Sequence, residues 1–103
     1  MKINIGDKFS KISEFWHPYT VGELNNNFIK LAKLKGKHIW HKHNDEDEML
    51  MVITGILLID FRNGRMVKTL PGEILIIPKG VEHLPRTFNE EEVLVMMIES
   101  KKN

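Results

Sequence analysis

Residues 36–55 have the sequence GKHIWHKHNDEDEMLMVITG, and this stretch decides the fold and the chemistry that we expect. It joins a run of histidines and acidic residues to an apolar segment at positions 49–53, with a glycine at each end. His41 and His43 are two positions apart, so on a strand their side chains would project from the same face, about 6.6 Å apart along the chain. Two imidazoles at that spacing can converge on one metal ion. The stretch therefore predicts a strand that carries a metal site.

From residue 19 onward the chain reads as short strands separated by turn residues. Glycine, proline and asparagine recur at intervals of roughly 8–12 residues, and this spacing indicates an antiparallel sandwich or barrel. The segments predicted to be strands are 19–24, 28–34, 37–42, 49–54, 56–61, 65–70, 74–78, 83–88 and 93–99.

Two of the turns have sequences that specify their geometry. Asn63-Gly64 lies between two apolar runs and predicts a β-hairpin with a type I′ turn, because both central residues of that turn need a positive φ. Pro71-Gly72 predicts a type II turn, in which proline sets φ at the first central position and glycine takes the positive φ at the second.

The opening of the chain has the periodicity of a helix. Asp7 is a candidate N-cap, and Phe9, Ile12 and the pair at 15–16 follow at helical spacing. Pro18 ends the pattern, because a proline disfavours the helical conformation of the residue before it. We expect a short amphipathic helix that packs on the outside of the domain.

Two of the predicted strands, at 49–53 and 74–77, are apolar at consecutive positions. A strand with one face in water alternates between apolar and polar residues, so a continuous apolar run indicates that both faces are covered. The barrel interior would cover one face, and one short helix can cover only part of the other. We therefore expect a homodimer formed by the packing of sheets.

A second stretch, residues 72–87, has the sequence GEILIIPKGVEHLPRT. In their order along the chain, the two stretches resemble the two motifs of the cupin superfamily, G-x5-H-x-H-x3,4-E-x6-G and G-x5-P-x-G-x2-H-x3-N. They depart from these motifs at two points: four residues instead of five separate Gly36 from His41, and Thr87 stands in place of asparagine. The resemblance covers about residues 28–99.

This resemblance implies an all-β fold, the cupin double-stranded β-helix or jelly-roll barrel, with a short N-terminal helix. It implies a single domain over residues 1–103, in which residues 1–24 form the helix and an arm and residues 28–99 form the barrel. Within the superfamily, the chain looks like the small single-domain cupins described as mannose-6-phosphate-isomerase-like.

The same resemblance implies a metal site made of His41, His43, Glu48 and His83. The residues themselves support this set, because Glu48 begins the apolar strand after the histidines, and His83 follows a turn that can fold back over the same opening. Three neutral imidazoles and one carboxylate suit a divalent transition metal (Zn, Fe, Mn, Ni or Cu) and leave positions open for water or substrate.

Nearby residues offer alternatives to this set. Glu46 or Asp47 could replace Glu48 as the carboxylate ligand, although Glu48 is in register with the start of the strand. His17 and His38 lie outside the motifs, and we interpret them as surface or interface residues. On a regular strand, His38 would face away from the two motif histidines.

Two cations near the second motif, Lys79 and Arg86, could bind a carboxylate or a phosphate, or could be exposed cations without a ligand. Apart from Lys42, they are the candidate partners for a phosphate close to the motif residues. We therefore do not expect true phosphomannose isomerase activity.

The composition excludes several classes of protein. The chain has 103 residues, no cysteine, and 15 Lys+Arg against 14 Asp+Glu, for a formal net charge of +1. Without cysteine there are no disulfides, thiol nucleophiles or iron–sulfur clusters. A charge near zero favours neither nucleic acid nor an anionic membrane as a partner, and no apolar run reaches the roughly 20 residues of a membrane helix. We expect a cytoplasmic protein whose partner, besides its own second copy, is a small molecule.

Three functions fit these predictions, and the third of them is a purely structural or interaction role for the dimer. The first is a metalloenzyme, isomerase- or dioxygenase-like, that acts on a small polar molecule inside the barrel. The second is a non-catalytic module that binds a sugar or a carboxylate at the metal. The residues that line the interior would distinguish the first two, and those expected to point inward are Ile39, Leu50, Val52, Phe61 and Ile76.

Overall fold

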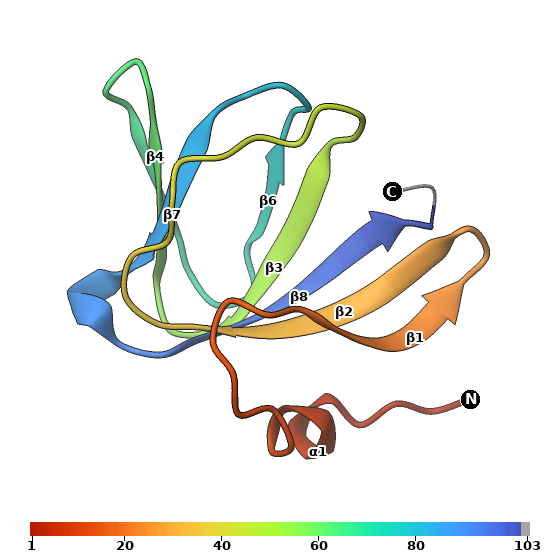
Figure 1. Cartoon of the computed structure of the whole chain (residues 1–103). Coiled ribbons are helices and arrows are strands. Elements are labelled where there is room, and N and C mark those ends of the chain that lie inside the picture. The colour runs from red at the N-terminus through yellow and green to blue at the C-terminus, as the bar shows by residue number, and fades with distance from the viewer. Residues whose placement is uncertain (102–103) are drawn as a thin grey trace.

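The computed structural model describes residues 1–101, and over these residues the regular structure is mostly β-strand (Figure 1). Within this part of the chain, no helix is long and apolar enough to cross a membrane. In chain order the elements are α1 (Ile5–Phe9), β1 (Tyr19–Leu24), β2 (Asn27–Leu34), β3 (Glu48–Thr54), β4 (Leu57–Phe61), β5 (Met66–Thr69), β6 (Ile74–Ile77), β7 (His83–Thr87), the 3-10 turn η1 (Phe88–Glu90) and β8 (Val93–Ser100).

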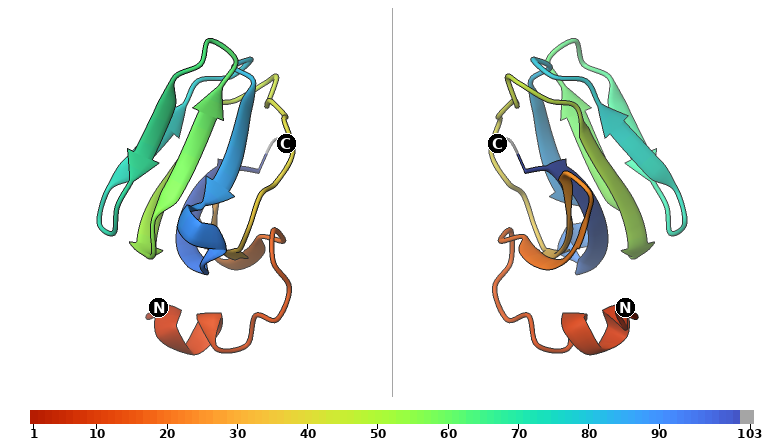
Figure 2. Two further views of the ribbon diagram at one scale, coloured as in Figure 1. Left: turned by 90° about the vertical axis from the view of Figure 1, so that its left-hand side faces the viewer. Right: turned by 90° about the vertical axis from the view of Figure 1, so that its right-hand side faces the viewer.

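The strands form two antiparallel sheets, one with the order β1-β2-β8-β3-β6 and one with the order β5-β4-β7. The two sheets lie as layers, with α1 beyond the larger sheet (Figure 2). Buried side chains from both sheets form the main core, and they are Ala32, Leu34, Leu50, Val52, Leu57, Ile59, Ile77, Val93, Val95 and Met97. The prediction of an all-β protein is therefore confirmed.

Of the residues predicted to point inward, three do so and two do not. Leu50 and Val52 are buried, and Phe61 packs against the core. Ile39 and Ile76 are 64% and 60% exposed, so the prediction is wrong for these two. Ile76 lies on β6, where side chains alternate between the two faces of the sheet, and the register turns its neighbours toward the core instead.

The helix is shorter than predicted and begins at a different residue. The side chain of Asn4, not that of Asp7, caps α1, because Asn4 Oδ1 accepts a hydrogen bond from the backbone N–H of Asp7 at 3.0 Å. Phe9 at the end of α1, and Ile12 just beyond it, pack with Leu31 in a second apolar cluster on the outer side of the larger sheet. The longer helix does not form, since Ile12 already reaches this cluster from the turn that follows α1.

The hairpin predicted at Asn63-Gly64 joins β4 to β5, but its turn type is not the predicted one. Gly64 has a φ of 87°, whereas Asn63 has no positive φ. The N–H of Gly64 donates to Phe61 O at 3.0 Å, and the N–H of Phe61 donates to Arg65 O at 2.9 Å. This is a three-residue loop, a type I turn followed by a left-handed glycine, so the type I′ prediction is wrong. At 71–72, the glycine has the positive φ of 84° that the predicted type II turn needs.

Candidate metal centre

The histidines of the first motif lie in a loop, and the strand predicted at 37–42 does not form. This loop, which connects β2 to β3, runs alongside β7 and pairs with it only at isolated positions. The N–H of His38 donates to Pro85 O at 2.9 Å, and His41 and His83 exchange two backbone hydrogen bonds of 3.0 and 2.9 Å. The backbone of His41 is thus held directly opposite that of His83.

Both ends of this loop are anchored by hydrogen bonds. At its start, the N–H of Gly36 donates to Thr87 Oγ1 at 2.8 Å, and the N–H of Thr87 donates to Gly36 O at 2.9 Å. At its other end, the N–H of Gly80 donates to His43 O at 2.6 Å. The threonine that departs from the second motif therefore has a structural role, since its hydroxyl and its backbone hold the first residue of the loop.

A slip in register changes the direction of one histidine. Lys37 is bridged to Arg86, and His41 to His83, so the loop advances four residues where β7 advances three. The extra residue breaks the alternation of a regular strand. As a result, His38 and His41 lie together, with ring centroids 5.3 Å apart. The interpretation of His38 as a surface or interface residue that faces away from the site is therefore wrong.

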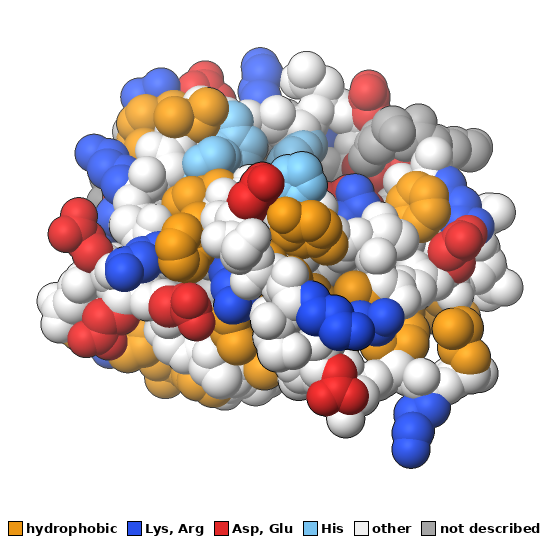
Figure 3. All heavy atoms as spheres, turned by 60° about the horizontal axis from the view of Figure 1, so that its bottom comes forward, with side chains coloured by type: hydrophobic (Ala, Val, Ile, Leu, Met, Phe, Trp, Pro, Cys, Tyr) orange, Lys and Arg blue, Asp and Glu red, His pale blue; other side chains and the backbone are white. Residues whose placement is uncertain are grey.

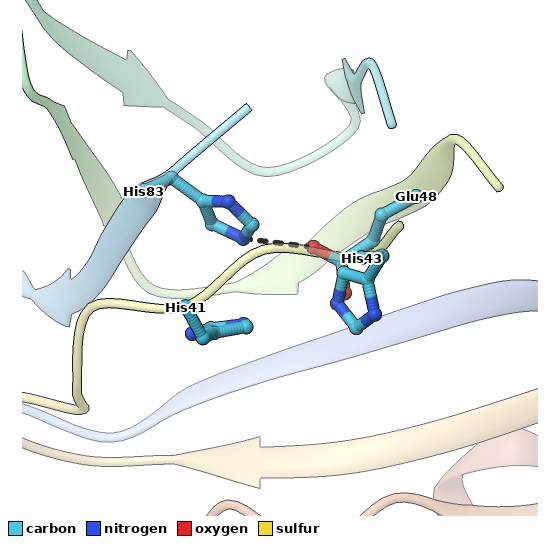
Figure 4. A group of neighbouring side chains, drawn as sticks. All are labelled: His41, His43, Glu48 and His83. Atoms are coloured by element: carbon cyan, nitrogen blue, oxygen red, sulfur yellow. Dashed lines mark ion pairs between the residues drawn. The ribbon is translucent and has the colours of Figure 1, made fainter. Parts of the chain in front are cut away.

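The structure brings all four of the predicted ligands together. One candidate ligand atom from each of His41, His43, Glu48 and His83 lies within 4.8 Å of the others. β3 supplies the glutamate, β7 supplies His83, and the loop supplies the other two histidines (Figure 4). The ring centroids of the histidines are 4.4–6.1 Å apart. We refer to these four residues as the quartet.

Backbone carbonyls orient two of the imidazoles. His41 Nδ1 lies 2.9 Å from Ile39 O, and His83 Nδ1 lies 3.0 Å from Val81 O. A carbonyl only accepts, so in each ring Nδ1 carries the proton and, in the neutral ring, Nε2 keeps a free lone pair. This is the arrangement in which a histidine binds a metal through Nε2.

Two nitrogen atoms of the quartet lack a hydrogen-bond partner. His43 Nε2 and His83 Nε2 lie 3.2 and 3.3 Å from the carboxylate oxygens of Glu48, yet both are buried and neither makes a hydrogen bond of suitable geometry. Nitrogen lone pairs that face a carboxylate repel it, and a cation between them removes the repulsion. The donor atoms therefore fit a metal ion.

The electrostatics of the quartet are dominated by the glutamate and the buried histidine. Burial opposes the charge of Glu48, but contact with His83 and the charges of His43 and His41 outweigh it and lower the pKa of Glu48. Burial also disfavours a charge on His83, but Glu48 and the carbonyl of Val81 raise its pKa. Without a metal, a proton on His83 therefore stabilises the pair.

The alternative carboxylates have other partners. Asp47 Oδ1 accepts the N–H of Lys79 at 2.9 Å, and Glu46 Oε2 accepts the N–H of Ser100 at 3.3 Å. Neither carboxylate belongs to the quartet, in which Glu48 supplies the oxygen ligand.

The cations named as candidate ligand partners lie elsewhere. Arg86 donates from Nε and Nη2 to the carboxylate of Asp60 at 2.7 and 3.2 Å, and this pairing raises the pKa of the guanidinium. Lys79 is exposed. Neither residue lines the cavity beside the quartet. His17 is exposed, as predicted.

A cavity of about 250 Å³ adjoins the quartet. Its lining includes three of the four quartet residues, together with side chains that are mostly apolar. On the face shown in Figure 3, histidine side chains gather with hydrophobic side chains beside them. Side chains of the larger sheet such as Leu50 and Met97 line the cavity, as do Leu57 and Ile59 of the smaller one, so it lies between the two layers.

The family model for the cupin domain, Cupin_2, matches residues 28–99. The chain belongs to the cupin family. A cupin-2 domain protein of Shewanella frigidimarina has the same fold, with a TM-score of 0.89 and 42% identity over 95% of this chain and 93% of that one. Protein NMB1881 of Neisseria meningitidis matches with a TM-score of 0.85 and 30% identity over 97% of this chain and 99% of that one. The uncharacterized protein YdbB of Bacillus subtilis (strain 168) is 33% identical over 79 residues, which are 77% of this chain and 70% of YdbB.

These comparisons confirm that the chain is a small cupin with the all-β cupin fold.

Sequence reasoning did not identify all of the residues beside the quartet. Trp16, His38 and Glu99 also line the cavity. Of these three residues, only Glu99 could be predicted from the local sequence to face the cavity, because it alternates with Val95 and Met97 along β8. The other two depend on the loop register and on the path of the N-terminal arm.

Proposed function

We propose that the quartet binds one divalent transition metal ion, and that this cupin is a small metalloenzyme, isomerase- or dioxygenase-like, acting on a small molecule in the adjacent cavity. The observation that carries the proposal is the pair of buried Nε2 atoms, of His43 and His83, that face Glu48 without a hydrogen bond. Three imidazoles and one carboxylate suit Zn, Fe, Mn, Ni or Cu. When bound, such an ion would polarise a substrate oxygen as a Lewis acid or, if it is redox-active, would bind O₂ and substrate.

The residues around the quartet prepare the site. The carbonyls of Ile39 and Val81 hold two of the imidazoles with Nε2 available, which sets their orientation before a ligand arrives. The apolar lining keeps water away from the reacting atoms and strengthens electrostatic interactions there. Of the titratable residues that line the cavity in the described part of the chain, two lie outside the quartet, namely His38 and Glu99.

One observation favours a second function, a non-catalytic module that binds a sugar or carboxylate at the metal. Glu99 is in an ion pair with Lys30 at 2.6 Å, and burial together with the charge of His41 lowers the pKa of His38. Outside the quartet, the described lining therefore offers one titratable side chain that is not in an ion pair, the imidazole of His38, which the lowered pKa keeps neutral. Both functions would use the same metal ligands, and they differ in whether the bound molecule is converted to a product.

Elemental analysis of protein purified without chelator, followed by an oxygen-uptake screen, tests both functions. We expect about one equivalent of metal per chain, and loss of that metal in the variant His83→Ala. The variant His17→Ala, which changes an exposed histidine outside the quartet, should keep the metal. Substrate-dependent turnover would favour the enzyme over the binding module. A protein that takes up no transition metal, even when each ion is supplied, would contradict the proposal.

We also propose that the cupin forms a homodimer through the outer face of β3 and β6. Ile74 and Ile76 are 58% and 60% exposed there. In the sheet register, Ile76 lies beside Met49, and Met49 beside Ile98, so an apolar row crosses three strands. Contiguous exposed apolar surface is uncommon on monomers.

Sedimentation analysis tests the dimer. Wild-type protein should sediment with twice the chain mass at micromolar concentration, and Ile76→Glu should sediment as a monomer. Thr20→Glu, on the exposed edge strand β1 and outside the apolar row, is the matched control. A wild-type monomer would rule out this interface. The predicted cytoplasmic location stays a prediction.

A further inference from the structure

Part of the cavity wall comes from outside the two sheets. Trp16 belongs to the segment between α1 and β1, yet its side chain lines the cavity. Its backbone N–H donates to Lys33 O at 2.8 Å, and its indole Nε1–H donates to Lys35 O at 2.9 Å. Both of its N–H donors are therefore used to hold the residue against the end of β2.

The backbone of Trp16 is itself unusual, with a φ of 62°. A bulky side chain rarely adopts this left-handed conformation, and it persists only where the surroundings hold it in place. The conformation turns the indole toward the cavity. The arm is thus folded so that a large flat ring forms one wall.

Trp16 and His38 form an aromatic stack in which each ring covers one face of the other. Their rings are stacked, with centroids 4.6 Å apart and an interplanar angle of 9°. The His38 ring in turn meets His41 edge to face at 5.3 Å. The aromatic stack therefore extends from the arm to the edge of the quartet.

Within residues 1–101, the rest of the lining carries no lysine or arginine side chain. Ten of the fifteen described residues around the cavity are apolar, and the other five are His38, His41, His43, Glu48 and Glu99. Of the two carboxylates in the lining, Glu48 would be a ligand of the metal, and Glu99 pairs with Lys30. Apart from the metal, a phosphate or sulfate group would find no group in this lining that compensates its charge.

The volume limits the size of a ligand. An apolar cavity of roughly 150 Å³ holds one benzene molecule, and this cavity measures about 250 Å³. The cavity therefore has room for one substituted ring.

From these observations we infer the substrate class, on the basis of the proposed function. The cavity takes a small, largely apolar molecule of one ring or equivalent size, which reaches the metal through one or two oxygen atoms and packs against the stack of Trp16 and His38. Trp16 is a specificity-determining residue. Sugar phosphates do not belong to the class.

The two tryptophans of the chain allow a direct test. Trp40 lies outside the cavity lining, with the Arg62 guanidinium 3.9 Å above its ring. Trp40→Phe leaves Trp16 as the only indole, and Trp16→Phe leaves Trp40 as the control. Catechol is the flat probe with two adjacent oxygen atoms, and mannose 6-phosphate is the contrasting probe. Binding is followed by tryptophan fluorescence and by calorimetry, on zinc-loaded and on metal-free protein.

Catechol should quench the fluorescence of Trp40→Phe saturably and leave that of Trp16→Phe nearly unchanged. Trp16→Leu should weaken catechol binding about tenfold, the effect of losing one aromatic contact, and Trp16→Phe by a smaller factor. The pair Leu and Phe is used because both keep apolar volume at this position. Mannose 6-phosphate should give no saturable signal.

The outcomes separate this inference from the proposed function. If the protein takes up none of the supplied transition metals, zinc included, the proposed function fails, and phenol binding to the metal-free cavity still tests the aromatic wall through Trp16 fluorescence. If zinc binds but catechol does not quench Trp16, or if mannose 6-phosphate binds as tightly as catechol, the inferred substrate class is wrong. Equal binding by the Leu and Phe variants would overturn the role of Trp16.

Discussion

The quartet is assembled from two kinds of structure, two residues on strands and two in a loop. Glu48 and His83 stand on β3 and β7, and their side chains are 11% and 0% exposed. His41 and His43 stand in a loop that pairs with β7 only at separate points, and the side chain of His43 is 42% exposed. The strand half is therefore part of the core, whereas the loop half is held against it by a few hydrogen bonds. Changes in the two halves should have different consequences for folding and for metal binding.

The largest difference should follow from removing one histidine of each half. His83→Ala should lower metal affinity by at least about a hundredfold, beyond the usual effect of losing an outer-shell partner. It should also lower the free energy of unfolding of the metal-free protein by about 2–4 kcal/mol, because it leaves a void beside a buried carboxylate. His43→Ala should weaken metal binding similarly but cost less than about 1 kcal/mol of stability. Metal titration and urea denaturation measure both effects, and equal losses of stability would remove the distinction.

Two glycines offer the next comparison. Gly55 directly follows β3 and has a φ of 85°, and an added Cβ would lie 2.7 Å from Glu92 O. Gly36 begins the loop with a φ of 81°, and an added Cβ would meet nothing within 4 Å. We expect Gly55→Ala to cost about 3–5 kcal/mol, from overlap and backbone strain together, and Gly36→Ala about 1–2 kcal/mol, from strain alone. Thermal and chemical denaturation distinguish them, and a reversed order would contradict the contacts at Gly55.

Two buried threonines extend the comparison to smaller changes in the free energy of unfolding. Thr87→Val removes the hydroxyl that accepts the N–H of Gly36 and should cost about 1–3 kcal/mol, with weaker metal binding because the loop loses its first anchor. Thr69 is the matched control, since its buried Oγ1 has no hydrogen-bond partner. Thr69→Val should be neutral or should stabilise by about 1 kcal/mol, without an effect on metal binding. If the two variants lose stability equally, the hydroxyl of Thr87 is not an anchor.

The smallest effect is a dependence on pH. In the metal-free protein the pKa of His83 is raised above its ordinary value of 6.5, so its pairing with Glu48 stabilises the fold below that value, and this stability is lost as pH rises through the folded pKa. The pKa of Glu48 is lowered, so its contribution is lost only at more acidic pH. Metal binding needs unprotonated imidazoles and strengthens as pH rises. The increase in Tm on adding zinc should therefore grow by a few degrees between about pH 5.5 and pH 8. If the zinc-induced increase in Tm became smaller over this pH range, the assignment of the quartet as the metal site would be contradicted.

Much of the strand half could be predicted from the sequence, and less of the loop half. The apolar run before Gly55 and the turn before His83 gave two of the strands directly. The spacing of His41 and His43 suggested a strand that does not form, because the extra residue between the two bridges to β7 depends on a partner from the other half of the chain. The alternation of side chains expected from the loop sequence alone does not indicate such a change of register. The same slip brings His38 beside the cavity, which no pattern within the loop predicts.

The N-terminal arm was also predicted only in part. The apolar spacing of Phe9 and Ile12 located the residues that cover the larger sheet, although the helix ends at Phe9. The position of Trp16 depends on hydrogen bonds to two carbonyls at and beyond the end of β2. These contacts come from tertiary structure, and helical periodicity alone pointed to the wrong conformation at this residue.

The two backbone hydrogen bonds between His41 and His83 join segments from opposite halves of the chain. Bringing such segments together has an entropic cost before any contact compensates it, so this pairing should form late during refolding. An ion that binds the completed quartet arrives after the rate-limiting step. Added zinc should then leave the refolding rate unchanged and slow the unfolding rate, so that it prolongs the lifetime of the native state without guiding the chain toward it.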